Sequence, residues 1–274
     1  MPVEQTEFFP APFDVAADRY DETFTVSKIG QAQRASVWKE LEKAFHSQDR
    51  VLELGCGTGV DARFLARQGT TVFACDSSSQ MIRAARRNIQ ELKSTLMGSV
   101  HLHQLRIEEI SALKNEGPFD GAFSNFGALN CVEDLRSLAI DLAKLLRPGA
   151  SALLCLMGPC CAWEIVWYLA EGRPRKALRR LCRGGVTARL ADQATVRVHY
   201  PGVRSLARIF FPEFRLKSVK GVGVSVPPSY GEPWAVRFPR LFEFCLRADS
   251  ALGRCPGVRI FADHILLRFE RQDV

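Results

Sequence analysis

The amino-acid sequence predicts an α/β fold in which helices flank a sheet of mostly parallel strands. Short apolar runs alternate with helical patterns over most of the chain, as expected of strand–helix–strand units. The first apolar run, Val51–Leu54, passes directly into a glycine-rich turn and then into a helix. A strand that turns on glycines into a helix is typical of domains that bind a nucleotide-like ligand.

Length and composition bound the class of protein. The chain has 274 residues, of which 47% are hydrophobic and 24% charged, and this fits one large, water-soluble α/β domain. No basic region followed by an apolar run opens the sequence, so no signal peptide is expected. The apolar stretch 150–170 is interrupted by Gly158 and Pro159, which favours a strand followed by a helix over a membrane span.

The cysteine pattern and the net charge indicate the redox environment and the possible partners of the protein. The nine cysteines form no C-x-x-C pair and have no metal-site spacing with the five histidines. We therefore expect a reduced, cytoplasmic protein without a bound metal. The formal net charge is +7, and a dense group of basic residues lies at 173–183.

The glycine-rich turn differs from the common phosphate-binding patterns. Gly55, Gly57 and Gly59 stand at alternate positions, and Val60 occupies the place of the last glycine in a dinucleotide fingerprint. A phosphate loop would also need a lysine, which is absent. Glu53, just before the turn, would repel a pyrophosphate and suits a cationic ligand.

The stretch from Glu53 to Gly59 resembles motif I of the class I S-adenosylmethionine-dependent methyltransferases, an acid followed by G-x-G-x-G. The resemblance implies a Rossmann-like seven-stranded sheet whose last strand is antiparallel. It also implies S-adenosyl-L-methionine as cofactor and S-adenosyl-L-homocysteine as its product. That cofactor carries an amino group and a sulfonium but no phosphate, which agrees with the acid. Its expected contacts in the turn are Glu53, Gly55, Cys56, Gly57 and Gly59.

The residues before the first strand are expected to form an irregular arm, at 1–18, and an amphipathic helix over 31–45. In many members of the family a tyrosine ahead of the core closes over the cofactor, and Tyr20 resembles that residue. The alternative is that Tyr20 only anchors the arm.

The second strand, Thr71–Cys75, ends in Asp76. This acid lies about twenty residues beyond the first glycine, the distance at which such a carboxylate reaches a ribose. Ser77 is expected to cap the next helix. Asp76, Ser77 and Met81 resemble the family's second motif and are assigned to the cofactor, although Asp76 also fits a purely structural helix cap.

The third strand is expected at 100–105 and leads into the adenine end of the site. Many relatives place an aspartate where this chain has Arg106, so the pattern is broken there. Ile107 fits the apolar floor of an adenine pocket. Glu108 or a backbone carbonyl is left to bind the adenine amine.

The fourth strand begins at Phe119, and Asn125 and Phe126 follow it. Ligands of open parallel sheets bind beyond the carboxyl ends of the strands, so these two residues are expected beside the sulfonium. Enzymes of the family that methylate amines of nucleic acids carry an Asn-Pro-Pro-aromatic motif. Gly127 stands where a proline is required, so that chemistry is not supported.

A helix over 132–146 and a Leu-x-Pro-Gly turn ending at Gly149, another family feature, lead into the fifth strand at 151–157. An aromatic helix at 162–170 and a basic helix at 173–183 then resemble the lid that the family often inserts over its substrate. The basic helix has three interpretations: a solvated face, contact with anionic lipid, or contact with RNA phosphates.

The chain is expected to return to the sheet after the lid. We expect a strand-like run at 196–200, a helix at 202–211, a sixth strand at 214–224, a helix at 232–252 and a last strand at 258–269. The result is one domain of 1–274 with four parts. These parts are an arm and helix (1–46), a cofactor-binding core (47–157), a lid (158–212) and the C-terminal strands (213–274).

No residue is assigned as a catalytic base. His199, in the segment leading out of the lid, is the best-placed candidate, and His264 beside Asp263 is a weaker one. His101 and His103 lie on the third strand, away from the expected site. Pro159 with Cys160 matches only part of the Pro-Cys signature of RNA cytosine methyltransferases.

The sequence therefore predicts methyl transfer from S-adenosylmethionine to a small, apolar or amphiphilic molecule by in-line displacement, in which positioning lowers much of the barrier. The layout resembles small-molecule methyltransferases of bacterial secondary or lipid metabolism. The alternatives are an RNA or protein methyltransferase that uses the basic helix, and a non-catalytic protein that binds S-adenosylmethionine.

Overall fold

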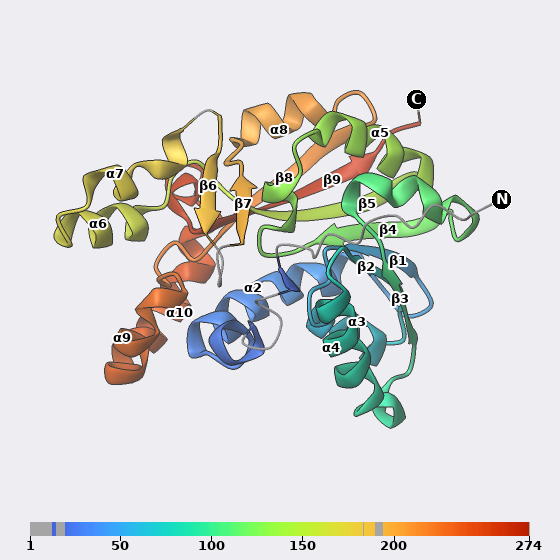
Figure 1. The fold of residues 1–274 in the computed structure, drawn as a ribbon, viewed down its shortest axis with the longest axis horizontal. Coiled ribbons are helices and arrows are strands. Elements are labelled where there is room, and N and C mark those ends of the chain that lie inside the picture. The colour runs from blue at the N-terminus through green and yellow to red at the C-terminus, as the bar shows by residue number, and fades with distance from the viewer. Residues whose placement is uncertain (1–12, 15–19, 183, 190–193, 274) are drawn as a thin grey trace.

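The computed structural model describes residues 13–14, 20–182, 184–189 and 194–273 (Figure 1). Its centre is a seven-stranded sheet with the strand order β3-β2-β1-β4-β5-β9-β8. The first five strands pair in parallel, and β9 is antiparallel to both β5 and β8, which confirms the predicted sheet. The strands are β1 Arg50–Leu54, β2 Thr71–Asp76, β3 Ser99–Gln104, β4 Phe119–Ser124, β5 Leu146–Met157, β8 Phe214–Val222 and β9 His264–Arg271.

Helices cover both faces of the sheet (Figure 1). One face packs against α5 Leu135–Leu145 and α8 Val203–Phe210, and the other against α2 Lys28–Ala44, α3 Val60–Arg67 and α4 Ser79–Gln90. Because side chains alternate along a strand, Leu52 and Leu54 of β1 join the α5 side of the core and Val51 joins the α2 side. The same alternation places Glu53 under α2 and α3.

Strand order reverses at β1, which lies between β2 and β4. Such a reversal leaves a crevice beyond the carboxyl ends of the two central strands. The glycine-rich turn follows β1 at this point, and the residues after β4 reach the same edge.

Two helices begin at residues other than those expected. α2 begins at Lys28 because the hydroxyl of Ser27 caps it by accepting a hydrogen bond from the Gly30 N–H. α4 is capped by Ser78, whose hydroxyl accepts from Met81 N–H, so the prediction that Ser77 is the cap was wrong by one residue. The expected arm at 1–18 lies almost entirely outside the described residues.

The segment between β5 and β8 differs most from expectation. The basic stretch 173–183 does not form one helix, and the strand-like run near 196 is half of a hairpin that was not expected. The elements of this segment are α6 Ala162–Ala170, α7 Pro174–Ala177, a 3₁₀ turn at Arg179–Leu181, β6 Val186–Arg189, β7 Thr195–Val198 and α8.

The C-terminal region contains two further departures. The helix expected at 232–252 is divided into α9 Glu232–Arg237 and α10 Pro239–Leu252, because Pro239 has no N–H with which to continue the helix across Phe238. The last strand begins at His264, after a 3₁₀ turn at Arg259–Phe261. Within the described ranges, no helix combines the length and the hydrophobicity needed to cross a bilayer.

Candidate active site

The glycine-rich turn has the backbone geometry that only glycine adopts easily. Gly55, Gly57 and Gly59 have φ values of 72°, 52° and 76°. A Cβ on Gly55 would lie 2.4 Å from the Ala128 Cβ, so the turn packs closely against the loop after β4. A Cβ on Gly57 would meet no atom within 4 Å, so the main chain there faces open space. The turn therefore leaves its middle exposed to a ligand.

A cavity lies over this open part of the turn. Six of the residues predicted to bind the cofactor line it: Tyr20, Gly55, Cys56, Gly57, Asn125 and Phe126. Sequence reasoning missed four others: Arg34 from α2, Thr58 from the turn, and Val60 and Asp61 from the start of α3. The cavity is thus built where α2, the turn and the β4 exit loop meet.

Asp61 is the polar centre of the cavity wall. Its Oδ1 accepts hydrogen bonds from Arg34 Nη1 at 2.6 Å and from Trp38 Nε1 at 2.7 Å. Its Oδ2 accepts from Asn125 Nδ2 at 3.0 Å. Arg34 also lies over the ring of Phe126, with the guanidinium carbon 5.1 Å from the ring centroid. Burial lowers the pKa of Arg34, but the Asp61 carboxylate outweighs it, so the net pKa is raised and the guanidinium stays charged.

Two buried oxygens next to this centre have no hydrogen-bond partner among the described residues. They are Oε2 of Glu53 and Oδ1 of Asn125, on side chains that are 2% and 7% exposed. Burial, and then the Asp61 carboxylate, raise the pKa of Glu53 well above its usual value. A buried acceptor without a donor is costly. The pair therefore suits a ligand that brings an N–H group or a positive charge, and a bound ammonium would lower the pKa of Glu53.

Tyr20 lines the same cavity and immediately precedes the π-helical turn Asp21–Thr25. Burial raises the pKa of its phenol, although the Arg34 charge opposes the rise, so it stays protonated at neutral pH. Asp21 accepts a hydrogen bond from the Thr58 hydroxyl at 2.7 Å, which fixes this turn to the glycine-rich turn. Tyr20 is therefore held over the cavity.

Asp76 links the second strand to the glycine-rich turn. Its Oδ2 accepts from Gly57 N at 2.9 Å, and its Oδ1 accepts from Ser78 N at 2.9 Å. Burial raises the pKa of this carboxyl, and the two N–H donors oppose the rise. Each oxygen keeps a second lone pair, so the backbone contacts leave the carboxylate able to accept further hydrogen bonds. Ser77 beside it is exposed.

The residues predicted for the adenine end separate into two groups. Met81 is buried on α4, and Ile107 Cδ1 lies 3.5 Å from the place that a Cβ of Gly55 would take. Glu108 instead is exposed and faces Arg106, with Nε and Oε2 3.7 Å apart. The structure thus brings Ile107 to the turn, buries Met81 and leaves Glu108 at the surface.

Phe126 separates the cavity from a second polar cluster. Its φ of 51° is rare for a residue with a side chain. Its ring contacts Phe24 at 5.0 Å on one side and His264 at 5.6 Å, edge to face, on another. The loop after β4 therefore holds an aromatic ring between two polar regions.

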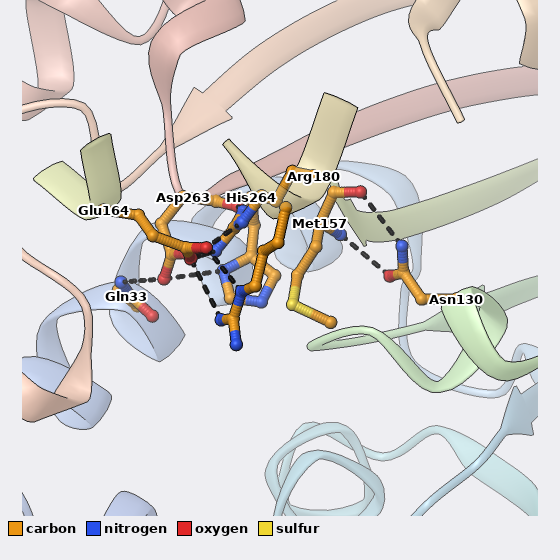
Figure 2. Close-up of polar contacts among 8 residues, drawn as sticks. Gln33, Asn130, Met157, Glu164, Arg180, Asp263 and His264 are labelled. Atoms are coloured by element: carbon orange, nitrogen blue, oxygen red, sulfur yellow. Dashed lines mark hydrogen bonds and ion pairs between the residues drawn. The ribbon is translucent and has the colours of Figure 1, made fainter. Parts of the chain in front are cut away.

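The second cluster lies at the start of β9, where His264 pairs with Met157 at the end of β5. Figure 2 shows Glu164 of α6 and Arg180 turned toward Asp263. Arg180 donates to Asp263 Oδ1 and to the Asp263 carbonyl, both at 2.8 Å, and to Glu164 Oε2 at 2.9 Å. All four side chains are buried. We call Glu164, Arg180, Asp263 and His264 the ion cluster.

The ion cluster holds an aspartate–histidine pair. His264 Nδ1 lies 3.3 Å from Asp263 Oδ2, and Gln33 Nε2 donates to the same oxygen at 3.2 Å (Figure 2). Burial alone would raise the pKa of Asp263, but His264 and Arg180 hold it well below the usual range. Asp263 therefore stays ionised and is available to orient and stabilise a protonated imidazole.

His199, the base candidate from the sequence, is placed differently. Its backbone exchanges hydrogen bonds with Asn130, whose side chain also bonds both backbone groups of Met157 (Figure 2). Its ring faces the hairpin, with Nδ1 2.9 Å from the place that a Cβ of Gly185 would take. His199 is therefore not among the residues that line the cavity.

Comparisons with known proteins agree with this geometry. Residues 51–149 match the model of the family described as "Methyltransferase domain". A demethylmenaquinone methyltransferase from Clavibacter sepedonicus is 29% identical over 145 residues, which are 53% of this chain and 56% of that protein. A tRNA 5-carboxymethoxyuridine methyltransferase from Escherichia coli is 30% identical over 180 residues, 62% of this chain and 67% of that protein. The chain spans between 56% and 59% of three demethylmenaquinone relatives.

Solved structures extend the likeness in fold to nearly the whole chain. The CcbJ methyltransferase from Streptomyces caelestis superposes with a TM-score of 0.62 at 16% identity, covering 96% of this chain and 98% of that one. An S-adenosylmethionine dependent methyltransferase from Mesorhizobium loti gives a TM-score of 0.54 at 18% identity, covering 88% of this chain and 100% of that one. From the sequence relatives and the shared fold, the chain belongs to the class I S-adenosylmethionine-dependent methyltransferases.

Proposed function

We propose that this chain transfers a methyl group from S-adenosylmethionine to a small, apolar or amphiphilic molecule. The observation that carries the proposal is the pair of unpartnered buried acceptors, Glu53 Oε2 and Asn125 Oδ1, beside the open backbone at Gly57. The ammonium group of the cofactor's methionine part can donate hydrogen bonds to such acceptors, whereas a pyrophosphate has no donor to offer them. The geometry thus favours the family's own cofactor over a dinucleotide.

The other proposed contacts with the cofactor follow from where each residue lies around the glycine-rich turn. Asp76 would accept the ribose hydroxyls, and Met81 and Ile107 would cover the adenine, with Ser77 and Glu108 at its open rim. Arg34, which the sequence did not single out, would pair with the cofactor carboxylate. The bound cofactor supplies a methyl carbon already activated by the sulfonium. The chain then has to orient the acceptor and exclude water.

The acceptor would lie between Phe126 and the inserted segment 158–212, which we propose as the lid. Its α6 carries Trp163 and Trp167, whose rings lie 6.0 Å from Trp234 and 5.3 Å from Tyr230. The Tyr230 hydroxyl is buried without a partner among the described residues. An aromatic wall with a single polar atom suits an apolar or amphiphilic acceptor. Relatives named for demethylmenaquinone support a small molecule of this kind.

The Asp263–His264 pair supplies the base in this proposal, for acceptors that must lose a proton. His264 contacts Phe126, which lines the cofactor cavity, and its Nδ1 faces an ionised carboxylate. Nδ1 makes no hydrogen bond among the described residues, although it lies 3.3 Å from Asp263 Oδ2. In this proposal Nδ1–H would turn to donate to the Asp263 carboxylate, which would leave Nε2 able to take a proton. His264 thereby replaces His199 as the favoured candidate.

RNA methylation is the second candidate, favoured by the tRNA-modifying relative. Against it, two of the basic residues that were expected to face a partner form ion pairs inside the protein instead. Arg179 and Arg180 both bind Glu164, and Arg180 also binds Asp263. The nine free cysteines meanwhile support a reducing, cytoplasmic setting for either reaction.

The experiment that tests the proposal is calorimetric titration with S-adenosylmethionine and S-adenosylhomocysteine, with NAD as the negative control. Asp76→Ala should lose ~2–3 kcal/mol of binding free energy, roughly 30- to 150-fold in affinity. Asp141→Ala on α5, where the carboxylate pairs with Lys144 at the surface, is the matched control and should bind as wild type does.

Turnover separates the candidate reactions. Formation of S-adenosylhomocysteine with a quinol-like acceptor but not with tRNA would support the small-molecule reaction. Equal affinity in wild type and Asp76→Ala would refute the site. Binding without turnover on either acceptor class would favour a non-catalytic cofactor-binding protein.

A further inference from the structure

The exposed apolar side chains of the protein are concentrated in four helices. Of the fifteen large hydrophobic residues that are most exposed among the described ones, ten lie on or beside α6, α7, α9 and α10. The most exposed of these include Val166 at 65%, Leu181 at 56%, Val236 at 55% and Phe244 at 67%. Single exposed apolar residues are ordinary, but a group of this size marks an interaction surface.

These helices form one continuous region. The rings of Trp163 on α6 and Trp234 on α9 are 6.0 Å apart, and Tyr230, which precedes α9, contacts Trp167 at 5.3 Å. In Figure 1 the pair α6–α7 and the pair α9–α10 project at the same end of the molecule, beyond the edge of the sheet. We call the outer side of α6, α7, α9 and α10 the lid face.

The apolar residues occupy helical stripes on the lid face. Val166 and Leu169 are spaced i, i+3 on α6, and Leu241 and Phe244 repeat that spacing on α10; all four are at least 49% exposed. Residues three apart lie on one side of a helix. Each helix therefore presents an unpartnered apolar stripe to solvent.

Basic residues surround these stripes. The segments 162–183 and 229–254 contain ten Lys and Arg but five Asp and Glu, so they supply most of the formal net charge of +7. Two of the five acids, Glu164 and Asp249, are buried, and a third, Glu232, accepts hydrogen bonds from the start of α2. Exposed cations such as Arg175 and Arg240 are left with few nearby acids.

We propose that the lid face docks on an anionic lipid bilayer. Apolar side chains flanked by Lys and Arg are the composition that binds the interface of such a membrane, where the apolar groups enter the acyl boundary and the cations meet headgroup phosphates. The helices concerned are too short to span, so the contact is peripheral. A second copy of the chain is disfavoured because two strongly positive faces repel each other.

RNA is a weaker match for the same surface. It offers phosphates to the basic residues but leaves aliphatic side chains such as Val166 and Leu169 without an apolar partner. Docking on a membrane also explains the position of the surface. The outer side of the lid would face the bilayer while its inner side covers the acceptor, so an acceptor dissolved in the membrane enters directly. This last point rests on the proposed function, whereas the binding itself does not.

Vesicle sedimentation tests the proposal. Wild-type protein is mixed with vesicles of phosphatidylcholine alone, or with about one third phosphatidylserine, and the bound fraction is measured at low and high salt. The double variant Val166→Ser/Phe244→Ser removes apolar contacts, and Arg175→Glu/Arg240→Glu reverses two charges. The matched control Met97→Ser/Phe211→Ser changes two side chains that are 76% and 68% exposed outside the lid face.

Wild type should bind the phosphatidylserine vesicles, with binding weakened by salt. Either lid-face variant should bind roughly tenfold more weakly or worse, and the control should bind as wild type does. Binding unaffected by both lid-face variants, or equally lost in the control, would overturn the proposal. So would binding of tRNA instead of vesicles that depends on Arg175 and Arg240.

Calorimetry on the same variants separates this proposal from the proposed function. S-adenosylmethionine affinity should be unchanged in all of them, because none contacts the glycine-rich turn. Wild-type protein that binds vesicles but not S-adenosylmethionine would refute the proposed function and leave the membrane contact standing. Wild-type protein that binds S-adenosylmethionine but not vesicles would refute the membrane contact and leave the proposed function standing.

Discussion

Replacing Arg180 with methionine tests whether the ion cluster holds the inserted segment to the sheet. Methionine keeps much of the length of the side chain but removes the hydrogen bonds that Arg180 makes with Glu164 of α6 and with Asp263 before β9. Arg180 is 6% exposed, so no water replaces those bonds without rearrangement. Two buried carboxylates would lose their shared cation.

The expected loss of unfolding free energy depends on the partners that the two carboxylates keep in the variant. Breaking a buried ion pair by removing one partner typically costs 3–5 kcal/mol, because a charge is left without compensation. Here Glu164 keeps both hydrogen bonds from Arg179, and Asp263 keeps the hydrogen bond from Gln33 and the nearby ring of His264, whose Nδ1 is 3.3 Å away. We therefore expect the lower end of the range, about 3 kcal/mol of unfolding free energy at neutral pH. Arg180→Lys retains the positive charge but not the several N–H donors of the guanidinium, and should lower the unfolding free energy by less than Arg180→Met does.

The pH dependence provides an independent check. His264 and Arg180 hold the pKa of Asp263 below its usual value in the folded protein. The stabilisation from this depressed pKa is present above the unfolded-state pKa of about 3.9 and is lost as the pH falls further. In the variant the pKa of Asp263 rises. The difference in stability between wild type and Arg180→Met should therefore be constant near neutrality and shrink below about pH 4.

Urea denaturation followed by tryptophan fluorescence measures the effect, since the chain has four tryptophans. Arg175→Met, an exposed arginine on α7, is the control and should change the unfolding free energy by less than about 0.5 kcal/mol. A loss below about 1 kcal/mol in Arg180→Met, or a loss that does not vary with pH, would refute the reasoning.

Three further predictions concern the glycine-rich turn, the base and the thiols. Both Gly57→Ala and Gly59→Ala should cost about 1–2 kcal/mol because φ is positive. Gly59→Ala should unfold at lower urea than Gly57→Ala, since its Cβ would also lie 2.9 Å from the Ala85 Cβ on α4, whereas Gly57→Ala should in addition lower S-adenosylmethionine affinity. His264→Asn should reduce kcat roughly 100-fold with cofactor affinity unchanged, and an unchanged kcat across the pH range would exclude it as the base. Burial raises the pKa of Cys75 to about 12, so at pH 8 a thiol reagent followed by mass spectrometry should label exposed Cys255 and leave Cys75 unlabelled until unfolding.

Local patterns were sufficient for the parts of the site that lie at strand ends. Glycines at alternate positions after an apolar run predicted the turn, and an acid ending the next run predicted Asp76. Parallel strands bring their carboxyl ends to one edge, so residues after β4 such as Asn125 and Phe126 were expected there too. The sheet itself followed from the same alternation of apolar runs and helices.

The polar connections of the site were beyond local reasoning because they join distant residues. Arg34 and Asp61 are 27 residues apart, and Arg180 and Asp263 are 83 apart. One signal existed for the first pair: Arg34 and Trp38 lie i, i+4 on an otherwise amphipathic helix, so two donors share one face. For the second pair the basic stretch looked like a solvated surface, since nothing local indicates that Arg179 and Arg180 turn inward.

The departures in secondary structure have a similar origin. Pro239 marked the break between α9 and α10, but the apolar spacing on both sides favoured one helix. The strands of the β6–β7 hairpin alternate apolar and polar residues but have only four residues each, which is too short a pattern to predict a hairpin from sequence.

Asn130 holds two points of the chain together, Met157 just before the inserted segment and His199 after its β6–β7 hairpin. Its side chain bonds both backbone groups of Met157, and its side chain and main chain both bond the His199 backbone, which precedes α8. A loop whose ends are held together by the core can change in length at small cost, about 0.6 kcal/mol for each doubling. We therefore propose that residues 158–198 can be replaced by the equivalent segment of a relative without disturbing the sheet. Chimeras joined at 157 and 199 should keep the cofactor site of one parent and take the acceptor preference of the other.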